Sequence, residues 1–279
     1  RPWGGPSPSA GSPVPPLAAP ELEGARGENP HAPRFDGDRL YVVTFRQIDP
    51  LFIVDLADPA ALVLSGVLEV PGWSTYLEPL GDQLLAVGVE SGRVTVSLFD
   101  VADVTAPALL SRLALGPEGG HSWSEANYDE KAVEYLPNEG VVMVPFETWN
   151  WSTGAQQKAI QVVNVGTDAL TAGATIEHSF NPRRGSFIAG HFVSISGQEL
   201  LVHSTTSATP IVQLPLAWRT DRVVPVGDSL VQIEDGQSNY GWGFISLRSS
   251  GNAKLRITSA TDPDALEQVI DLGAGQIVS

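Results

Sequence analysis

A nucleophile, a base and an acid stand close together at one place, Gly119-Gly-His-Ser-Trp-Ser-Glu125. His121 and Ser122 are adjacent, and adjacent side chains of an extended chain point in opposite directions, so they do not form a catalytic triad by themselves. The printed sequence contains neither a G-x-S-x-G nucleophile motif nor a glycine-rich phosphate-binding loop. The segment is therefore predicted to be a polar loop, and no catalytic residue is assigned.

Metal binding is the second chemistry to consider. No metal ligand is assigned, because the histidines lack a ligand spacing such as H-x-x-x-H; they are His31, His121, His178, His191 and His203. Calcium is the one cofactor left open, since Asp36-Gly-Asp38 and Asp262-Pro-Asp264 place two carboxylates close together in turns. The competing interpretation is that these aspartates cap turns.

Charge and composition exclude several partners. The 279-residue chain has 16 Lys and Arg against 32 Asp and Glu, a formal net charge of −16. Such a polyanion repels phosphate backbones and anionic membrane surfaces, so nucleic acid is not expected as a partner. The chain has no cysteine, which excludes disulfides and thiolate metal sites, and no apolar run is long enough for a membrane span.

Residues 1–33 differ from the rest in being rich in Pro, Gly, Ala and Ser without apolar periodicity. They are predicted to be a linker or leader, because such a composition cannot bury enough apolar surface to form a core. The chain begins with Arg1 and shows no signal-peptide apolar region, so we expect a processed protein or a piece of a longer one.

From residue 34 onward, short β-branched runs alternate with Gly, Pro, Asp and Asn clusters, which predicts an all-β domain over 34–279. The recurring unit consists of a Gly-Asp pair, an inner strand, a strand ending in Asp, a turn and an outer strand. The predicted units cover about 34–70, 76–115, 128–179, 186–216 and 221–272. Their spacing is that of four-stranded β-propeller blades, in a ring that need not be complete. A β-sandwich is the competing fold.

Three segments carry a resemblance to a known family: 34–59, 70–80, and Tyr128-Asp-Glu-Lys-Ala-Val-Glu-Tyr135. They resemble secreted bacterial and archaeal proteins with a C-terminal β-propeller domain, distantly related to WD40 repeats, whose Tyr-Asp-His-Lys-Ala-Phe motif has Glu130 here in place of His. The likeness is strong over 34–165. It implies a propeller, an extracellular, cell-surface or periplasmic location, and earlier blades missing from this chain. It brings no established reaction.

In a propeller, four loops of this chain are expected to emerge on one face. Trp and Tyr provide large contact areas at low entropic cost. The candidate binding residues on this face are Trp73, Tyr76, Trp123, Trp149, Trp151, Arg46 and Asp49. The aromatic residues could instead plug the upper edges of the sheets, and Arg46 could pair with Asp49 between blades.

The function predicted from these observations is non-catalytic binding of a protein, peptide or glycan. The alternative is a hydrolase or lyase with its site in the propeller channel. A third hypothesis is a structural part of a larger assembly, in which another chain carries the missing blades.

Overall fold

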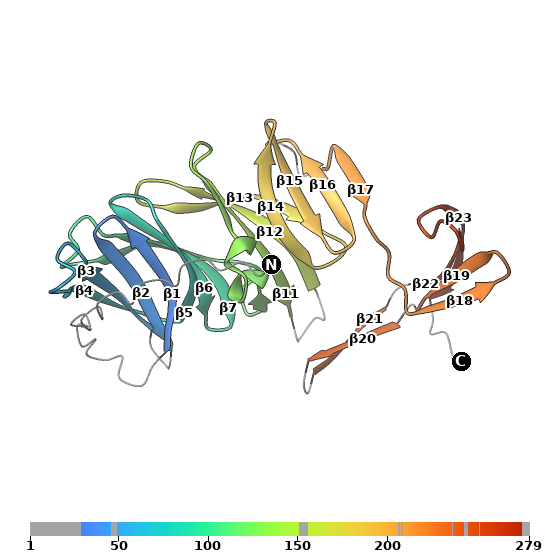
Figure 1. The fold of residues 1–279 in the computed structure, drawn as a ribbon, viewed down its shortest axis with the longest axis horizontal. Helices are drawn as coiled ribbons and strands as arrows, with labels where there is room; N and C mark the ends of the chain where they lie inside the picture. Colours follow the sequence, from blue (N-terminus) through green and yellow to red (C-terminus); the bar gives the residue numbers. More distant parts are fainter. Residues whose placement is uncertain are drawn as a thin grey trace, which may run out of the picture. The chain divides into compact units, whose positions relative to one another are not determined.

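The computed structural model describes residues 29–45, 49–150, 156–205, 207, 209–235, 237–242, 245–250 and 252–274. Within these ranges the chain consists of antiparallel strands and two short 3-10 helices (Figure 1). It divides into two compact units, Arg1–Leu214 and Pro215–Ser279.

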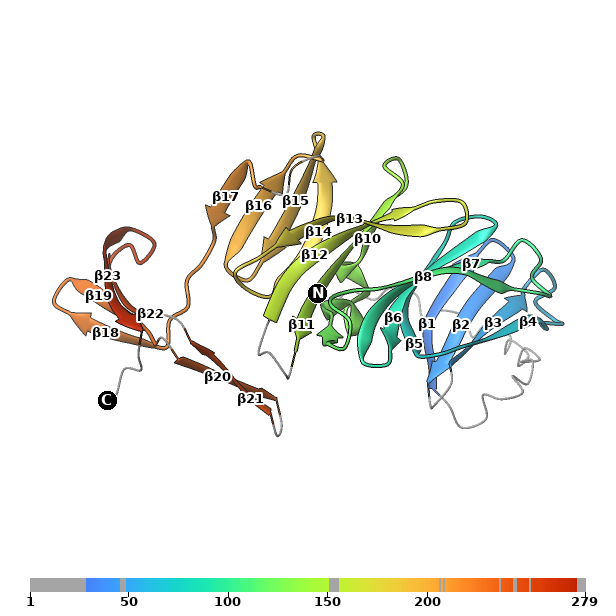
Figure 2. The same ribbon diagram turned by 180° about the vertical axis from the view of Figure 1, so that it is seen from behind.

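The first unit contains four sheets, seen from both sides in Figures 1 and 2. The first sheet consists of β1 (Asn29–Asp36), β2 (Arg39–Phe45), β3 (Asp49–Asp55) and β4 (Val63–Val70). The second consists of β5 (Trp73–Pro79), β6 (Gln83–Glu90), β7 (Arg93–Asp100) and β8 (Ala108–Ala114). The third consists of β10 (Glu134–Leu136), β11 (Val141–Trp149), β12 (Gln156–Val165) and β13 (Leu170–Glu177), with β9 (His121–Trp123) paired to β11. The fourth consists of β14 (Pro182–Ile188), β15 (His191–Ser196), β16 (Glu199–His203) and β17 (Val212–Pro215).

The second unit contains a fifth four-stranded sheet, made of β18 (Arg222–Val226), β19 (Ser229–Glu234), β22 (Asn252–Ser259) and β23 (Leu266–Ala274). A separate hairpin of β20 (Gln237–Trp242) and β21 (Ile245–Ser250) is inserted between β19 and β22. The prediction of an all-β fold with about five four-stranded units is therefore confirmed, whereas the inserted hairpin was not foreseen. Strand β1 begins at Asn29, inside the predicted leader, whose residues 1–28 lie outside the described part of the chain.

The repeated Gly-Asp pair has the same structural role in three sheets. Gly37, Gly81 and Gly227 adopt positive φ angles of 55°, 77° and 60°, which favour glycine in the first hairpin turn of each sheet. The carbonyl of the following aspartate accepts a hydrogen bond from a backbone N–H at the end of the third strand of the sheet, at 2.7 to 2.9 Å. The sequence repeat thus specifies a repeated turn.

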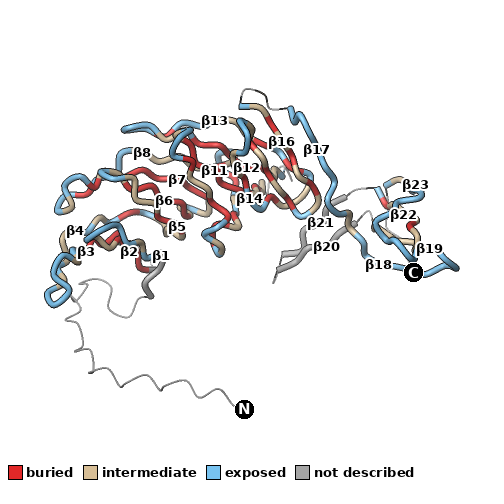
Figure 3. Tube along the Cα trace, turned by 45° about the horizontal axis from the view of Figure 1, so that its top comes forward, coloured by how far each residue is buried: buried red, intermediate tan, exposed pale blue. Residues whose placement is uncertain are grey.

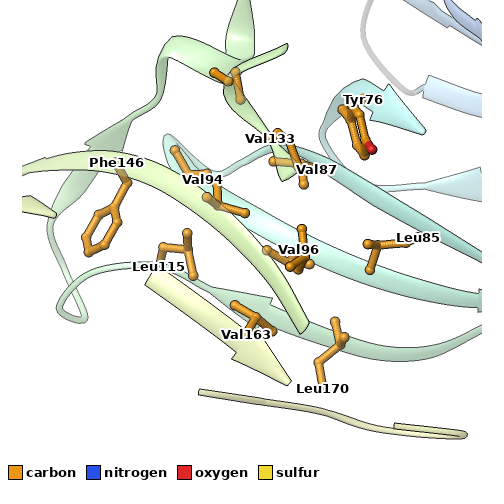
Figure 4. Packing of buried hydrophobic residues seen from close by; sticks show 14 of the residues in the cluster. Tyr76, Leu85, Val87, Val94, Val96, Leu115, Val133, Phe146, Val163 and Leu170 are labelled. Carbon is orange, nitrogen blue, oxygen red and sulfur yellow. The ribbon is translucent and has the colours of Figure 1, made fainter. Parts of the chain in front are cut away.

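Apolar side chains hold neighbouring sheets of the first unit together. Figure 4 shows the cluster between the second and third sheets, where Leu85, Val96 and Val163 are fully buried. Two further clusters lie between the first and second sheets and between the third and fourth. The middle strands β6, β7, β11 and β12 are the most deeply buried, whereas the outer strand β17 is exposed (Figure 3). Each sheet is therefore stabilised by apolar contact with its neighbours.

Among the residues that the structure describes, no helix is both long and apolar enough to cross a bilayer.

Candidate functional site

A pocket of about 460 Å³ lies where the first and second sheets meet the segment before β10. This volume is within the range of small-ligand sites. We call it the central pocket, and its lining consists of Ala32, Pro33, Arg34, Thr75, Ala126, Asn127, Tyr128 and Glu130. The contributing strands β1 and β5 each form the first edge of their sheet.

Irregular pairing opens both strands at the pocket. The register between β1 and β2 shifts between His31 and Arg34, and the register between β5 and β6 shifts between Ser74 and Tyr76. The extra residues at these shifts include Thr75, which lines the pocket. Bulges of this kind occur frequently beside functional sites, because they redirect side chains out of the regular pleat.

The remaining lining comes from two single-turn 3-10 helices, η1 (Glu125–Asn127) and η2 (Glu130–Ala132). The Ser124 hydroxyl caps η1 by accepting a hydrogen bond from the N–H of Ala126, and the carboxylate of Asp129 caps η2 by accepting one from the N–H of Lys131. Ala126 and Ala132 are 1% exposed and anchor the segment in the core. The two helix caps and the buried alanines therefore hold the backbone of the pocket wall in place.

Ion pairs fix the same segment from two sides. Arg34 on β1 donates through Nη2 to Glu130 and through Nε to the carbonyl of Leu77, at 2.9 Å for the latter. On β14, Arg183 donates to both carboxylate oxygens of Glu125, at 2.7 and 2.8 Å. These pairs tie the first and fourth sheets to one short segment. They therefore position the pocket wall rather than add much stability, since exposed pairs contribute little.

Asn127 is the most unusual residue of the pocket. Its side chain is buried, with 7% of the residue exposed, and neither its amide nitrogen nor its amide oxygen has a hydrogen-bond partner within the described part of the chain. An unpaired buried polar group costs about 1–3 kcal/mol, and native proteins retain few of them. Both amide atoms are covered in the free structure, so a ligand in the pocket can use their free donors and acceptors only once the atoms that cover them move aside.

Two exposed aromatic side chains stand beside Asn127. Tyr128 lines the pocket and is 75% exposed, and Trp123 is 44% exposed. Their ring centroids are 4.7 Å apart at an interplanar angle of 38°. Exposed aromatic rings at a pocket offer apolar contact area to a ligand.

The predicted binding residues are only partly brought together. Trp73 and Tyr76 lie in β5, Trp123 in β9 and Trp149 in β11, so the prediction that they lie in loops is wrong. The ladder of β11 continued further than the sequence suggested, with Trp149 opposite His121 and Gln156.

Two of the predicted residues adjoin the pocket. Tyr76 is 7% exposed, packs in the core and lies under the guanidinium of Arg34, 5.5 Å from its ring centroid. Burial raises the pKa of Tyr76 well above its usual range, so its hydroxyl stays neutral and donates to Glu78. Trp123 contacts the pocket through Tyr128.

Trp73 and Trp149 are not in the pocket lining, and the side chains of the remaining three predicted residues lie outside the described structure. Arg46 and Trp151 lie outside the described residues, and for Asp49 the structure describes only the backbone, which pairs with Val70. Sequence reasoning missed Asn127, Tyr128, Arg34, Glu130 and Thr75. The one signal for them was the motif beginning at Tyr128, which was used to identify the family and not to choose site residues.

A Ser-His-Glu arrangement occurs in the fourth sheet, away from the central pocket. Nε2 of His178 lies 2.9 Å from the Ser194 hydroxyl, and its Nδ1 lies 3.4 Å from a carboxylate oxygen of Glu199. Ser194 is 1% exposed and, unlike Asn127, lies outside the lining of the central pocket. Burial lowers the pKa of His178, which keeps the ring neutral. The arrangement is a buried polar network and not an open catalytic site.

Other candidates from the sequence serve local structure. The Ser122 hydroxyl accepts from the N–H of Val94 and donates to the carbonyl of Leu115, so it is engaged in holding β9. No group of three or more His, Asp or Glu side chains suited to a metal ion occurs among the residues described. The calcium prediction itself stays untested.

Comparison with known proteins places these sheets in a family. A family model described as a beta propeller domain matches residues 19–206. An uncharacterized protein of Archaeoglobus fulgidus is 39% identical over 119 residues, which are 42% of this chain and 19% of the relative. An uncharacterized protein of Methanocaldococcus jannaschii is 29% identical over 178 residues, which are 63% of this chain and 26% of the relative. The matches therefore span only about a fifth to a quarter of the length of these relatives.

Among solved structures, a protein from Lactobacillus plantarum aligns with a TM-score of 0.48 and 17% sequence identity, covering 67% of this chain and 55% of that one.

Proposed function

The chain belongs to the β-propeller domain family, and we propose that it is a non-catalytic binding module whose central pocket holds part of a protein, peptide or glycan. The propeller fold hosts many unrelated functions, so the proposal depends on the site and not on the fold. The observation that carries it is the buried, unpaired amide of Asn127 on the wall of the pocket.

The rigidity of the surroundings supports binding at this place. The wall is fixed by helix caps, by buried alanines and by the ion pairs of Arg34 and Arg183. A site that is already ordered loses little conformational entropy when a ligand binds. The cost of keeping Asn127 unpaired in the free protein is returned when a ligand satisfies its amide.

A ligand screen with matched variants tests the proposal. Libraries of peptides and glycans are screened against the purified chain, and each hit is measured again with Tyr128→Ala and with Phe35→Ala. Phe35 is 70% exposed and does not line the pocket, so it controls for the loss of an exposed aromatic ring. Binding that Tyr128→Ala weakens and Phe35→Ala leaves intact supports the pocket, and the reverse pattern contradicts it.

The alternative of a hydrolase or lyase in the channel can be tested with the same protein. Glu130 is the carboxylate in the lining of the pocket as described. Turnover of glycan or ester substrates that Glu130→Gln abolishes would replace the binding proposal with an enzymatic one.

A further proposed partner is a sheet that covers an apolar face of the second unit. Val224, Val231 and Ile257 lie opposite one another on adjacent strands and therefore share this face. Val231 lies four residues after the glycine of its Gly-Asp pair, and Leu85 lies at the same distance after the corresponding glycine of the second sheet. Leu85 is buried against the third sheet, so we expect the position of Val231 to be covered by a sheet as well. Co-purification with a chain carrying further blades, lost in Val231→Asp, would support this partner. Co-purification that survives the substitution would contradict it.

We place the protein outside the cytoplasm in this proposal, because residues 34–59 and 70–80 resemble secreted proteins. Fractionation of cells that express the full-length protein tests the location, and recovery in the cytoplasm alone would contradict it.

A further inference from the structure

We infer that the ligand of the central pocket is a neutral carbohydrate, held by the amide of Asn127 and stacked against the rings of Tyr128 and Trp123. This inference rests on the proposed function and narrows its ligand class. Four independent observations support it: the charge of the pocket, the small size of its apolar groups, the amide of Asn127 and the aromatic rings.

Charge argues for a neutral ligand. The charged side chains that line the pocket are Arg34 and Glu130, which form an ion pair, so the described lining carries no net formal charge. The whole chain carries −16, and its field repels phosphorylated, sulfated or acidic sugars. A basic peptide would need an unpaired carboxylate in the pocket, whereas the lining carboxylate is already paired with Arg34.

The apolar lining argues against a hydrophobic peptide anchor. Its apolar members are Ala32, Pro33 and Ala126, all of them small. Peptide and protein interfaces derive most of their affinity from large apolar or aromatic anchors that fill well-packed apolar wells. The described lining offers no well of that kind.

The Asn127 amide matches the chemistry of a sugar. Its NH₂ group offers two donors and its oxygen offers two acceptor lone pairs, and all of these are unpaired in the described structure. Neighbouring hydroxyl groups of a sugar each donate and accept, so a pair of them satisfies both ends of the amide together. Because the amide is buried, these hydrogen bonds form in an environment of low dielectric constant, where they are stronger than in water.

The aromatic rings favour a sugar over a peptide group. A peptide group could also pair with the amide, but the planar group itself has no face of C–H groups to place on Tyr128 and Trp123. A pyranose presents a face of polarised C–H groups to the electron-rich face of an aromatic ring. Tyr128 adjoins Asn127 in the sequence, so a ring stacked on it can place its hydroxyls at the amide.

A binding comparison tests the inference. The full chain is probed on arrays of neutral oligosaccharides, acidic oligosaccharides and peptides, and the strongest neutral oligosaccharide is then titrated calorimetrically. We expect selective binding of neutral oligosaccharides. Asn127→Leu and Tyr128→Ala should each weaken it about tenfold or more, the equivalent of about 1.4 kcal/mol, while Phe35→Ala changes it less than about twofold. Circular dichroism confirms that each variant is folded.

The possible outcomes distinguish an error in the proposed ligand class from an error in the proposed site. If peptides or acidic glycans bind and Asn127→Leu abolishes that binding, the carbohydrate inference is overturned and the binding function of the pocket stands. If neutral glycans bind equally well to both pocket variants, the site and the proposed function are overturned together. Absence of binding to every class at millimolar concentrations overturns both as well.

Discussion

Replacing Asn127 by leucine should make the free protein more stable while it destroys the binding site. Leucine has the same branching and the same number of side-chain heavy atoms as asparagine but carries no polar atoms. The amide of Asn127 is buried and lacks a partner among the described residues, so its removal relieves a desolvation penalty. Functional sites commonly carry such a stability cost.

The magnitude follows from the cost of one unpaired buried amide. That cost is about 1–3 kcal/mol, so Asn127→Leu should raise the free energy of unfolding by this amount. For a domain of this size each kcal/mol moves the melting temperature by about 2–4 °C, which predicts an increase of about 2–12 °C. Urea unfolding should show a higher midpoint at an unchanged slope, which would indicate a true change in stability.

Gln161 provides a matched control with the opposite sign. It is also 7% exposed, but its amide nitrogen donates to the carbonyls of Val162 and Gly173, and its oxygen accepts from the Thr175 hydroxyl. Gln161→Leu should therefore lower stability by about 1–3 kcal/mol, because it leaves those partners unpaired. If Asn127→Leu is as destabilising as Gln161→Leu, the Asn127 amide is satisfied in solution and the reasoning is refuted.

Three further predictions concern the fold. Burial lowers the pKa of His178 and of His203 below their ordinary 6.5, so the unfolded chain takes up these protons at a higher pH than the folded protein does. The free energy of unfolding should therefore be at its full value above about pH 6.5 and fall below that pH by up to about 1.4 kcal/mol per pH unit for each histidine. Urea unfolding at pH 7.5 and 5.5 measures this, and equal stabilities would contradict it. Gly66→Ala would place its Cβ 1.9 Å from the carbonyl oxygen of Val104. Denaturant unfolding should therefore show a loss of stability of at least about 2–3 kcal/mol. An unchanged stability would show that the backbone at Gly66 and the backbone at Val104 can move apart. Phe146→Ala should cost about 3–5 kcal/mol, because Phe146 is 2% exposed between the second and third sheets, and a loss under 1 kcal/mol would refute this packing.

The architecture could be predicted because its determinants are local. A Gly-Asp pair such as Gly81-Asp82 fixes a hairpin turn within a few residues, and the continuous burial along β6 and β7 follows from their being covered on both sheet faces. The inserted hairpin β20–β21 escaped prediction, because its residues 237–250 carry no Gly-Asp signal.

The site could be predicted only in part, because its determinants are distant in the sequence. Trp123 was selected by residue type alone, and it does lie beside the pocket. Arg34 and Glu130 are separated by 96 positions, and their pairing depends on how the first sheet meets the third. Whether the amide of Asn127 finds a partner also depends on the three-dimensional surroundings, so an asparagine in a polar stretch gives no sign of it.

The most direct test of a ligand at Asn127 is to follow its side-chain NH₂ resonances by NMR, in protein labelled with ¹⁵N-asparagine, during titration with a neutral oligosaccharide. The account predicts that the Asn127 resonances shift saturably, while those of Asn164, whose amide already donates to Thr171 at the surface, stay unchanged. A saturable titration that leaves the Asn127 resonances in place would contradict the account, because the ligand would then bind elsewhere.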